Sequence, residues 1–159
     1  MKVSIIVGST SDYEVMHGAE QFLADFGIEY ETRVISAHRT PDLMFEYAKA
    51  LKGRGFGVVI AGAGGAAHLA GVAAGLTPLP VIAVPMQTKT LGGLDSLLSM
   101  VQMPTGIPVA TVAIGGAKNA AILAAEIIAL LDPEVAKKID AYREAQAEKI
   151  RNTTLPPKQ

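Results

Sequence analysis

Cysteine and tryptophan are absent from this chain of 159 residues, and aromatic residues make up only 5% of it. Without cysteine the protein can form no disulfide and can use no thiolate as a nucleophile or metal ligand. The three histidines, at 17, 38 and 68, are far apart in the sequence, and no HExxH motif occurs. Because zinc sites here would need clustered His and carboxylates, the sequence predicts no metal site.

Charge is also scarce: 18% of residues are charged and the formal net charge is −1. No basic stripe suggests nucleic acid as a partner. No Asp, Glu, Lys or Arg occurs from 55 to 88, but repeated glycines and three prolines interrupt this segment. It lacks the run of about 20 apolar residues that a spanning helix needs, and residues 1–10 do not resemble a signal peptide. We therefore expect a soluble, cytoplasmic protein with no membrane partner.

Aliphatic residues are abundant: half of the residues are hydrophobic and the mean hydropathy is +0.33. Its length fits one domain, 1–159, with a core over about 2–151 and a loose polar tail at 152–159. So much apolar surface on so small a domain predicts association with copies of itself.

Short apolar strands alternate with helical patterns along the sequence. The expected strands are 3–7, 29–35, 57–61, 80–84 and 108–112. Helices are expected after a Ser11–Glu14 capping box up to Gly27, from Thr40 and Pro41 to Leu51, in a short segment after GAGGAAHLAG, at 91–101, at 117–131, and from Asp132–Pro133 onward. This alternation predicts an α/β fold in which helices cover both faces of one parallel sheet.

Three unusual turns follow the first three predicted strands: GSTSD (8–12), SAHRTP (36–41) and GAGGAAHL (62–69). In open α/β sheets, ligands bind beyond the carboxyl ends of the strands. We therefore expect the three turns to meet at one pocket.

GSTSD leads into a helix, where backbone N–H groups and the helix dipole favour an anion. Ser9 and Ser11 add hydroxyls, and Asp12 could accept hydrogen bonds from sugar hydroxyls. The alternative is a plain capping turn. In SAHRTP, Arg39 could bind a phosphate or carboxylate as a planar fork, and His38 could carry a proton near neutral pH. The alternative there is a solvated loop histidine beside a surface arginine.

GAGGAAHL loosely matches the dinucleotide-binding fingerprint, but no acidic residue follows about 20 positions later, so a nicotinamide cofactor is disfavoured. No GxxxxGK[ST] motif occurs either. The glycines instead allow close approach of a ligand to the backbone. His68 could line the pocket, although satisfying a buried carbonyl is favoured. His17 is expected on a polar helix face or in a subunit contact, and Asp95 and Ser96 in capping or interface packing.

GSTSD, SAHRTPD, IAGAGGAAHL and LDSLLSMVQMP, in that order and spacing, resemble the class I PurE family, the N5-carboxyaminoimidazole ribonucleotide mutases of purine biosynthesis. Related animal-type carboxylases instead have a motif similar to SAHKGP, and they lack GGAAHL. The resemblance implies a flavodoxin-like three-layer α/β/α fold with five parallel strands, a homo-octamer with sites at subunit interfaces, and no metal or organic cofactor. This chain departs from the family at Ala70, usually Pro, and at Thr105, usually Gly.

The resemblance also implies the reaction: N5-carboxyaminoimidazole ribonucleotide becomes 4-carboxy-5-aminoimidazole ribonucleotide through transient carbon dioxide, with His38 moving the proton. Substrate-binding residues are then expected at Ser9, Ser11, Asp12, Ser36, Arg39, Ala63, Gly64, Gly65 and Leu69. Two alternatives remain open: an enzyme that adds free carbon dioxide or bicarbonate to aminoimidazole ribonucleotide, and a non-catalytic nucleotide- or flavin-binding module, which would leave His38 without a role.

Overall fold

A computed structural model gives the fold and describes residues 1–155. The predicted tail at 152–159 therefore lies partly outside the described residues. Five strands form one sheet: β1 (Lys2–Val7), β2 (Tyr30–Val34), β3 (Phe56–Ala63), β4 (Val81–Pro85) and β5 (Ala110–Thr111). Six α-helices and two short 3₁₀ helices accompany them within the described residues: η1 (Thr10–Asp12), α1 (Tyr13–Asp25), α2 (Pro41–Ala50), η2 (Lys52–Arg54), α3 (Leu69–Leu76), α4 (Leu94–Val101), α5 (Ala117–Ala129) and α6 (Pro133–Arg151).

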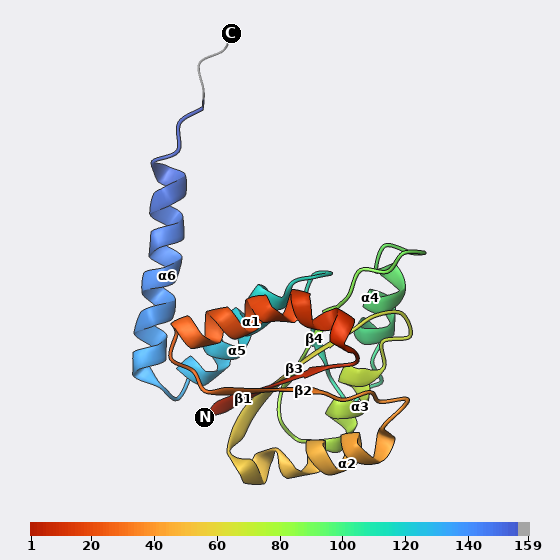
Figure 1. Cartoon of the computed structure of the whole chain (residues 1–159). Helices are drawn as coiled ribbons and strands as arrows, with labels where there is room; N and C mark the ends of the chain where they lie inside the picture. The colour runs from red at the N-terminus through yellow and green to blue at the C-terminus, as the bar shows by residue number, and fades with distance from the viewer. Residues whose placement is uncertain (156–159) are drawn as a thin grey trace.

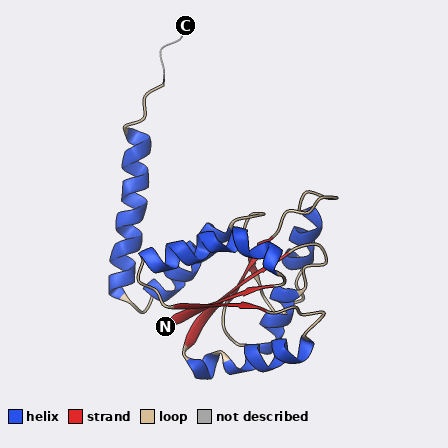
Figure 2. Ribbon diagram, in the orientation of Figure 1, coloured by secondary structure: helices blue, strands red, loops and turns tan. Residues whose placement is uncertain are grey.

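The sheet order is β2-β1-β3-β4-β5, and every neighbouring pair is parallel. Helices α1 and α5 cover one face, and α2 and α3 cover the other (Figure 1). This arrangement confirms the predicted flavodoxin-like three-layer fold. Because all five strands run the same way, their carboxyl ends share one edge of the sheet (Figure 2).

Two hydrophobic clusters hold the layers together, one on each face of the sheet. Alternate residues of β1 enter different clusters: Val3, Ile5 and Val7 face α1 and α5, whereas Ile6 faces α2 and α3. This alternation follows from the period of two along a strand. The central strands are buried on both faces, which explains their nearly continuous apolar sequences.

Helix α6 packs through one face only, as its sequence pattern predicts. Val135 and Ile139 are buried, and the ring of Tyr142 meets Phe22 and Phe26 edge-on at centroid distances of 5.4 and 5.8 Å. The remainder of the helix extends away from the body of the protein (Figure 1).

Several predicted boundaries are wrong for local reasons. The Ser11–Glu14 capping box does not form, because the 3₁₀ turn η1 precedes α1 and Ser9 caps that turn by accepting from the Ser11 amide at 3.0 Å. Helix α4 begins at Leu94 instead of 91, because Gly92 and Gly93 have φ of 64° and 101°. Such positive φ values end regular helix and favour glycine.

The last predicted strand and the helix after it are also shorter than expected. Strand β5 pairs with β4 only through Ala110 and Thr111, so it forms a short edge. Helix α5 ends at Ala129, and Leu130 and Leu131 lie beyond it, largely exposed. Hydropathy alone could not separate these two leucines from the buried alanines that precede them.

Candidate active site

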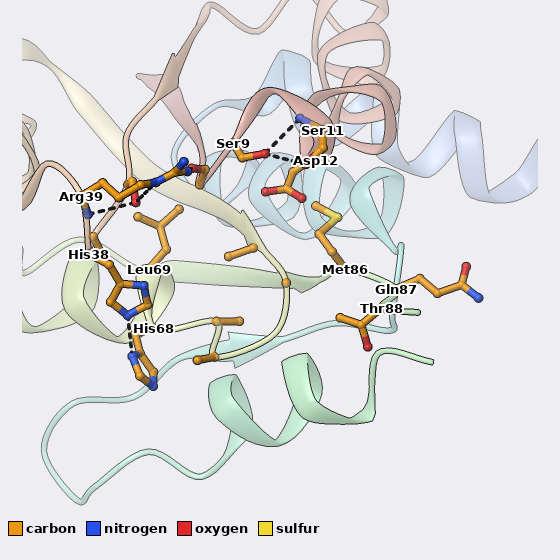
Figure 3. Close-up of a pocket in the computed structure, with 17 residues that line it drawn as sticks. Ser9, Ser11, Asp12, His38, Arg39, His68, Leu69, Met86, Gln87 and Thr88 are labelled. Carbon is orange, nitrogen blue, oxygen red and sulfur yellow. Dashed lines mark hydrogen bonds between the residues drawn. The ribbon is translucent and has the colours of Figure 1, made fainter. Parts of the chain in front are cut away.

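A cavity of about 580 Å³ lies at the carboxyl edge of the sheet. The turns after β1, β2 and β3 all reach it, as the sequence predicts, and the segment after β4 joins them (Figure 3). Its lining residues are Gly8, Ser9, Ser11, Asp12, Ser36, Ala37, His38, Arg39, Ala63, Gly64, Ala66, Ala67, His68, Leu69, Met86, Gln87 and Thr88. The strand order explains the convergence, since β2 and β3 flank β1.

The turn after β1 presents two hydroxyls and a carboxylate to the cavity. The Ser9 and Ser11 Oγ atoms lie 2.5 Å apart, and Ser9 Oγ also accepts the Ser11 amide. Asp12 is half-buried and lies at the N-terminal end of α1 (Figure 3). Burial raises the pKa of Asp12, although the Ser9 and Ser11 hydrogen bonds and the nearby Arg39 charge oppose the rise. Ionisation of Asp12 therefore costs free energy in the folded protein. Hydrogen bonds donated by a bound ligand would offset this cost.

That pKa shift predicts a stability gain for Asp12→Asn. The pKa of Asp12 is higher in the folded protein than its ordinary value of 3.8, so ionisation destabilises the folded state at neutral pH. We expect Asp12→Asn to raise the free energy of unfolding at pH 7. The gain should shrink as the pH falls through the folded pKa and vanish below about 3.8. Urea unfolding between pH 3 and 8 measures it.

Glu20→Gln is the matched control with the opposite sign. Burial of Glu20 would raise its pKa, but hydrogen bonds from Thr32, His17 and Tyr13 outweigh burial and lower it. Glu20→Gln should therefore lose stability at pH 7, and this loss should fade as the pH falls through the lowered pKa of Glu20. An Asp12→Asn variant that is less stable than wild type at pH 7 would contradict the assignment of Asp12 as a desolvated carboxylate.

Hydrogen bonds stabilise the turn after β2 internally, and Arg39 links this turn to the turn after β1. Thr40 Oγ1 donates to the Ser36 carbonyl at 2.9 Å and accepts the Ser36 amide at 3.1 Å. The Arg39 guanidinium donates from Nη2 to the Gly8 carbonyl at 2.9 Å and from Nε to Ser36 Oγ at 3.2 Å. A guanidinium has five N–H donors, so others remain for a ligand.

His38 and His68 meet in the cavity wall. His38 Nε2 lies 2.8 Å from His68 Nδ1, and the rings are nearly perpendicular at 82° (Figure 3). Both residues are exposed. The prediction that His68 satisfies a buried carbonyl is therefore wrong, because its ring contacts His38 instead. One facing nitrogen must donate while the other accepts, so the pair can share a proton but not carry one on each facing nitrogen.

The glycine turn after β3 forms an uncharged wall. Ala63, Gly64, Ala66, Ala67 and Leu69 line the cavity. Gly65, predicted to belong to this wall, does not line it. With a φ of 72°, Gly65 turns its amide towards helix α4, where it donates to Ser96 Oγ at 2.9 Å. Its role is to bend the turn, which only glycine does without strain.

Three lining residues were missed by the sequence predictions: Met86, Gln87 and Thr88, which follow β4. The rule that placed the other turns applies equally to them, because β4 is parallel to β3. They were overlooked because the segment carries no charge and no histidine.

Three other residues considered from the sequence, His17, Asp95 and Ser96, do not line the cavity. His17 is exposed on α1 and hydrogen-bonded to Glu20 at 3.0 Å, as expected for a polar helix face. Ser96 is fully buried, and the helix N-cap is Gly93, so the prediction that Ser96 serves in capping or interface packing is wrong. Asp95 accepts from Thr88 Oγ1 at 2.7 Å.

Across residues 1–155, no three His, Asp or Glu side chains are grouped so that they could hold a metal ion. Over the same range, no helix has the length and apolar character needed to cross a membrane.

A five-stranded parallel sheet with a cavity across its carboxyl ends defines a flavodoxin-like α/β protein, and this edge is where open α/β sheets bind small ligands. The model of the AIR carboxylase family matches residues 2–149. The chain therefore belongs to the AIR carboxylase family.

Its relatives carry a more specific name. A Thermotoga maritima protein called N5-carboxyaminoimidazole ribonucleotide mutase is 58% identical, over 94% of this chain and 87% of that protein. A Pyrococcus abyssi protein of the same name is 61% identical, over 90% of this chain and 82% of its own length. Among solved structures, Treponema denticola PurE superposes with a TM-score of 0.84 at 35% identity, covering 93% of this chain and 92% of that one.

Proposed function

We propose that this protein converts N5-carboxyaminoimidazole ribonucleotide into 4-carboxy-5-aminoimidazole ribonucleotide in purine biosynthesis. The observation that carries the proposal is the composition of one cavity. A guanidinium, an imidazole pair and an uncharged wall of small residues come from the turns after β2 and β3, and they face the same space as the hydroxyls of the turn after β1 (Figure 3). Relatives at 57–61% identity that bear the mutase name support it.

The phosphate and ribose would bind between the turns after β1 and β2. Arg39 spans these turns and keeps donors available for a phosphate. Ser9 and Ser11 offer hydroxyls at the start of the helical segment, where an anion is favoured. Asp12 would repel a phosphate and instead accept hydrogen bonds from the ribose. Holding these remote groups fixes the position of the imidazole ring, where the chemistry occurs.

The glycine turn would hold the transient gas. Carbon dioxide offers few hydrogen-bonding handles, so a small and neutral pocket suits it, whereas charged groups would favour water. Ala63, Gly64 and Ala67 supply such a surface, and Leu69 adjoins it. The absence of a side chain at Gly64 also lets the substrate ring approach the backbone closely.

The reaction requires one proton to move twice. The exocyclic carbamate breaks its N–C bond, releases carbon dioxide and leaves the nitrogen to take a proton. The C4 carbon of the ring then attacks the carbon dioxide, forms a C–C bond and loses its own proton. His38 would donate the first proton as a general acid and accept the second as a general base, so the enzyme returns to its starting state. His68 can share that proton across the 2.8 Å contact.

A direct carboxylation of aminoimidazole ribonucleotide is the second candidate, because the family model carries the description AIR carboxylase. The two reactions share a product and differ in the carbon source. A flavin- or nucleotide-binding module would leave the imidazole pair without a role.

We further propose that the protein acts as a cytoplasmic homo-oligomer, most simply the octamer that the resemblance implies. Helix α4 supports association, because Leu94, Leu98 and Val101 stand about half exposed at spacings of four and three residues.

The purified protein tests the activity directly. At low bicarbonate, we expect it to convert the N5-carbamate into the carbon-linked acid, whereas aminoimidazole ribonucleotide with bicarbonate should react poorly. Faster acid formation from aminoimidazole ribonucleotide and bicarbonate would favour the carboxylase. An absorbance spectrum with a flavin band would favour the binding module.

A further inference from the structure

Helix α4 does not line the cavity, but it contacts residues of the cavity wall, in part through a buried serine. Ser96 is fully buried and does not line the cavity. Its Oγ donates to the Met86 carbonyl at 2.8 Å and accepts the Gly65 amide at 2.9 Å. One hydroxyl thus joins the segment after β4 to the turn after β3.

A second serine on the same helix face adds to this contact. Ser99 lies three residues after Ser96, and residues at this spacing share a helix face. Its Oγ lies 3.2 Å from the Gly65 carbonyl and 2.7 Å from the Asp95 carbonyl. Both backbone polar groups of Gly65 therefore face hydroxyls of α4.

The joined segments are adjacent parts of the cavity wall, because Gly64 and Met86 directly follow the paired residues Ala63 and Pro85 of β3 and β4. Met86 and Gly64 both line the cavity, and a Cβ placed on Gly64 would come within 3.2 Å of Met86 Cβ. This close approach leaves little room between the two segments. A small relative displacement would open a gap beside the pocket assigned to carbon dioxide.

The serine also fixes the orientation of a peptide group. The Gly64 carbonyl and the Gly65 amide belong to one planar trans peptide, in which C=O and N–H point in opposite directions. Because the amide donates to Ser96, the Gly64 carbonyl points away from α4. Glycine at 64 and 65 would otherwise let this peptide rotate easily.

We infer that Ser96 is a positioning residue that keeps the glycine turn closed against Met86, so that carbon dioxide stays in the cavity between its release and its recapture. This inference rests on the proposed mutase function. It assigns Ser96 no contact with the substrate. Its predicted effect is on the fate of the intermediate, which a residue that only stabilises the fold would not change.

Ser96→Ala tests the inference through a ratio of products. The variant is given the N5-carbamate with carbonic anhydrase present, which removes any carbon dioxide that escapes. Initial rates of free aminoimidazole ribonucleotide and of the carbon-linked acid are measured and corrected for uncatalysed loss. We expect the ratio of free nucleotide to acid to rise roughly 2- to 10-fold, the range that one lost hydrogen bond supports. Unfolded protein lowers both rates together and leaves the ratio unchanged.

Ser4→Ala is the matched control. Ser4 is also fully buried, its Oγ lies 3.0 Å from the Tyr47 hydroxyl, and it does not line the cavity. It should lose stability as Ser96→Ala does but keep the wild-type product ratio. If Ser96→Ala fails to fold, Ser96→Cys keeps the atom count with a weaker donor and should raise the ratio less.

The outcomes separate the two claims. A wild-type ratio in the Ser96 variants, or an equal rise in Ser4→Ala, overturns the positioning role while leaving the mutase proposal intact. A wild-type protein that forms no carbon-linked acid overturns the mutase proposal, and the positioning role with it.

Discussion

Replacing His38 with Asn should lower turnover of the N5-carbamate about 100- to 10,000-fold, the usual loss when a general acid–base is removed. Asn is similar in size and keeps polar atoms near His68, but it cannot exchange a proton at neutral pH. Because the phosphate and ribose are proposed to bind to Arg39 and the turn after β1, we expect the affinity for the ribonucleotide to change little. Steady-state rates and calorimetric titration with aminoimidazole ribonucleotide measure the two effects separately.

His17→Asn is the control for this experiment. His17 is exposed on α1 and lies outside the cavity lining. It should turn over like the wild type. Near-wild-type turnover in His38→Asn would show that another group carries the proton, and His68 would be the first to test, because it is the only other histidine in the cavity lining.

Arg39→Ala should act mainly on binding. Among residues 1–155, the guanidinium is the only cationic side chain in the cavity lining, apart from any proton on the histidines. Hydrogen bonds to charged groups contribute about 1.5–3 kcal/mol, so the dissociation constant for aminoimidazole ribonucleotide should rise roughly 10- to 150-fold. Turnover at saturating substrate should fall less. Titration calorimetry gives the dissociation constant, and initial rates give the turnover.

Two further variants isolate the cause. Arg39→Lys keeps the charge but loses the planar fork that bridges Gly8 and Ser36, so it should bind more weakly than the wild type and more tightly than Arg39→Ala. Arg54→Ala removes an arginine that pairs with Glu31 away from the cavity, and it should bind normally. Unchanged affinity in Arg39→Ala would exclude this residue as the phosphate anchor.

The convergence of the three turns could be predicted because it depends on topology alone. Once the strands were identified as parallel, their carboxyl ends had to share an edge, and the turns at 8–12, 36–41 and 62–69 had to lie there. The centres of the strands could also be predicted, since runs of β-branched and apolar residues mark them. The predictions failed where a local backbone conformation decides the outcome.

Ser9, Gly65 and His68 illustrate that limit. Ser9 replaces Ser11 as the cap because a 3₁₀ turn precedes α1, and residue type does not distinguish the two hydroxyls. Gly65 leaves the cavity wall because its amide faces Ser96, a contact 31 residues distant along the chain. His68 contacts His38 across 30 residues. Contacts of this kind depend on side-chain direction, which hydrophobic periodicity does not encode.

The origin of the carboxyl carbon gives the most direct test of the proposal that carbon dioxide is released and recaptured within one cavity. The wild-type protein would be given N5-carbamate labelled with ¹³C at the carboxyl carbon, in buffer containing unlabelled bicarbonate and carbonic anhydrase. If the cavity retains the gas while His38 moves the proton, most of the carbon-linked acid formed at early times will carry the label. Unlabelled acid would mean that the carboxyl carbon comes from solution, and the proposal that the cavity retains the gas would be wrong.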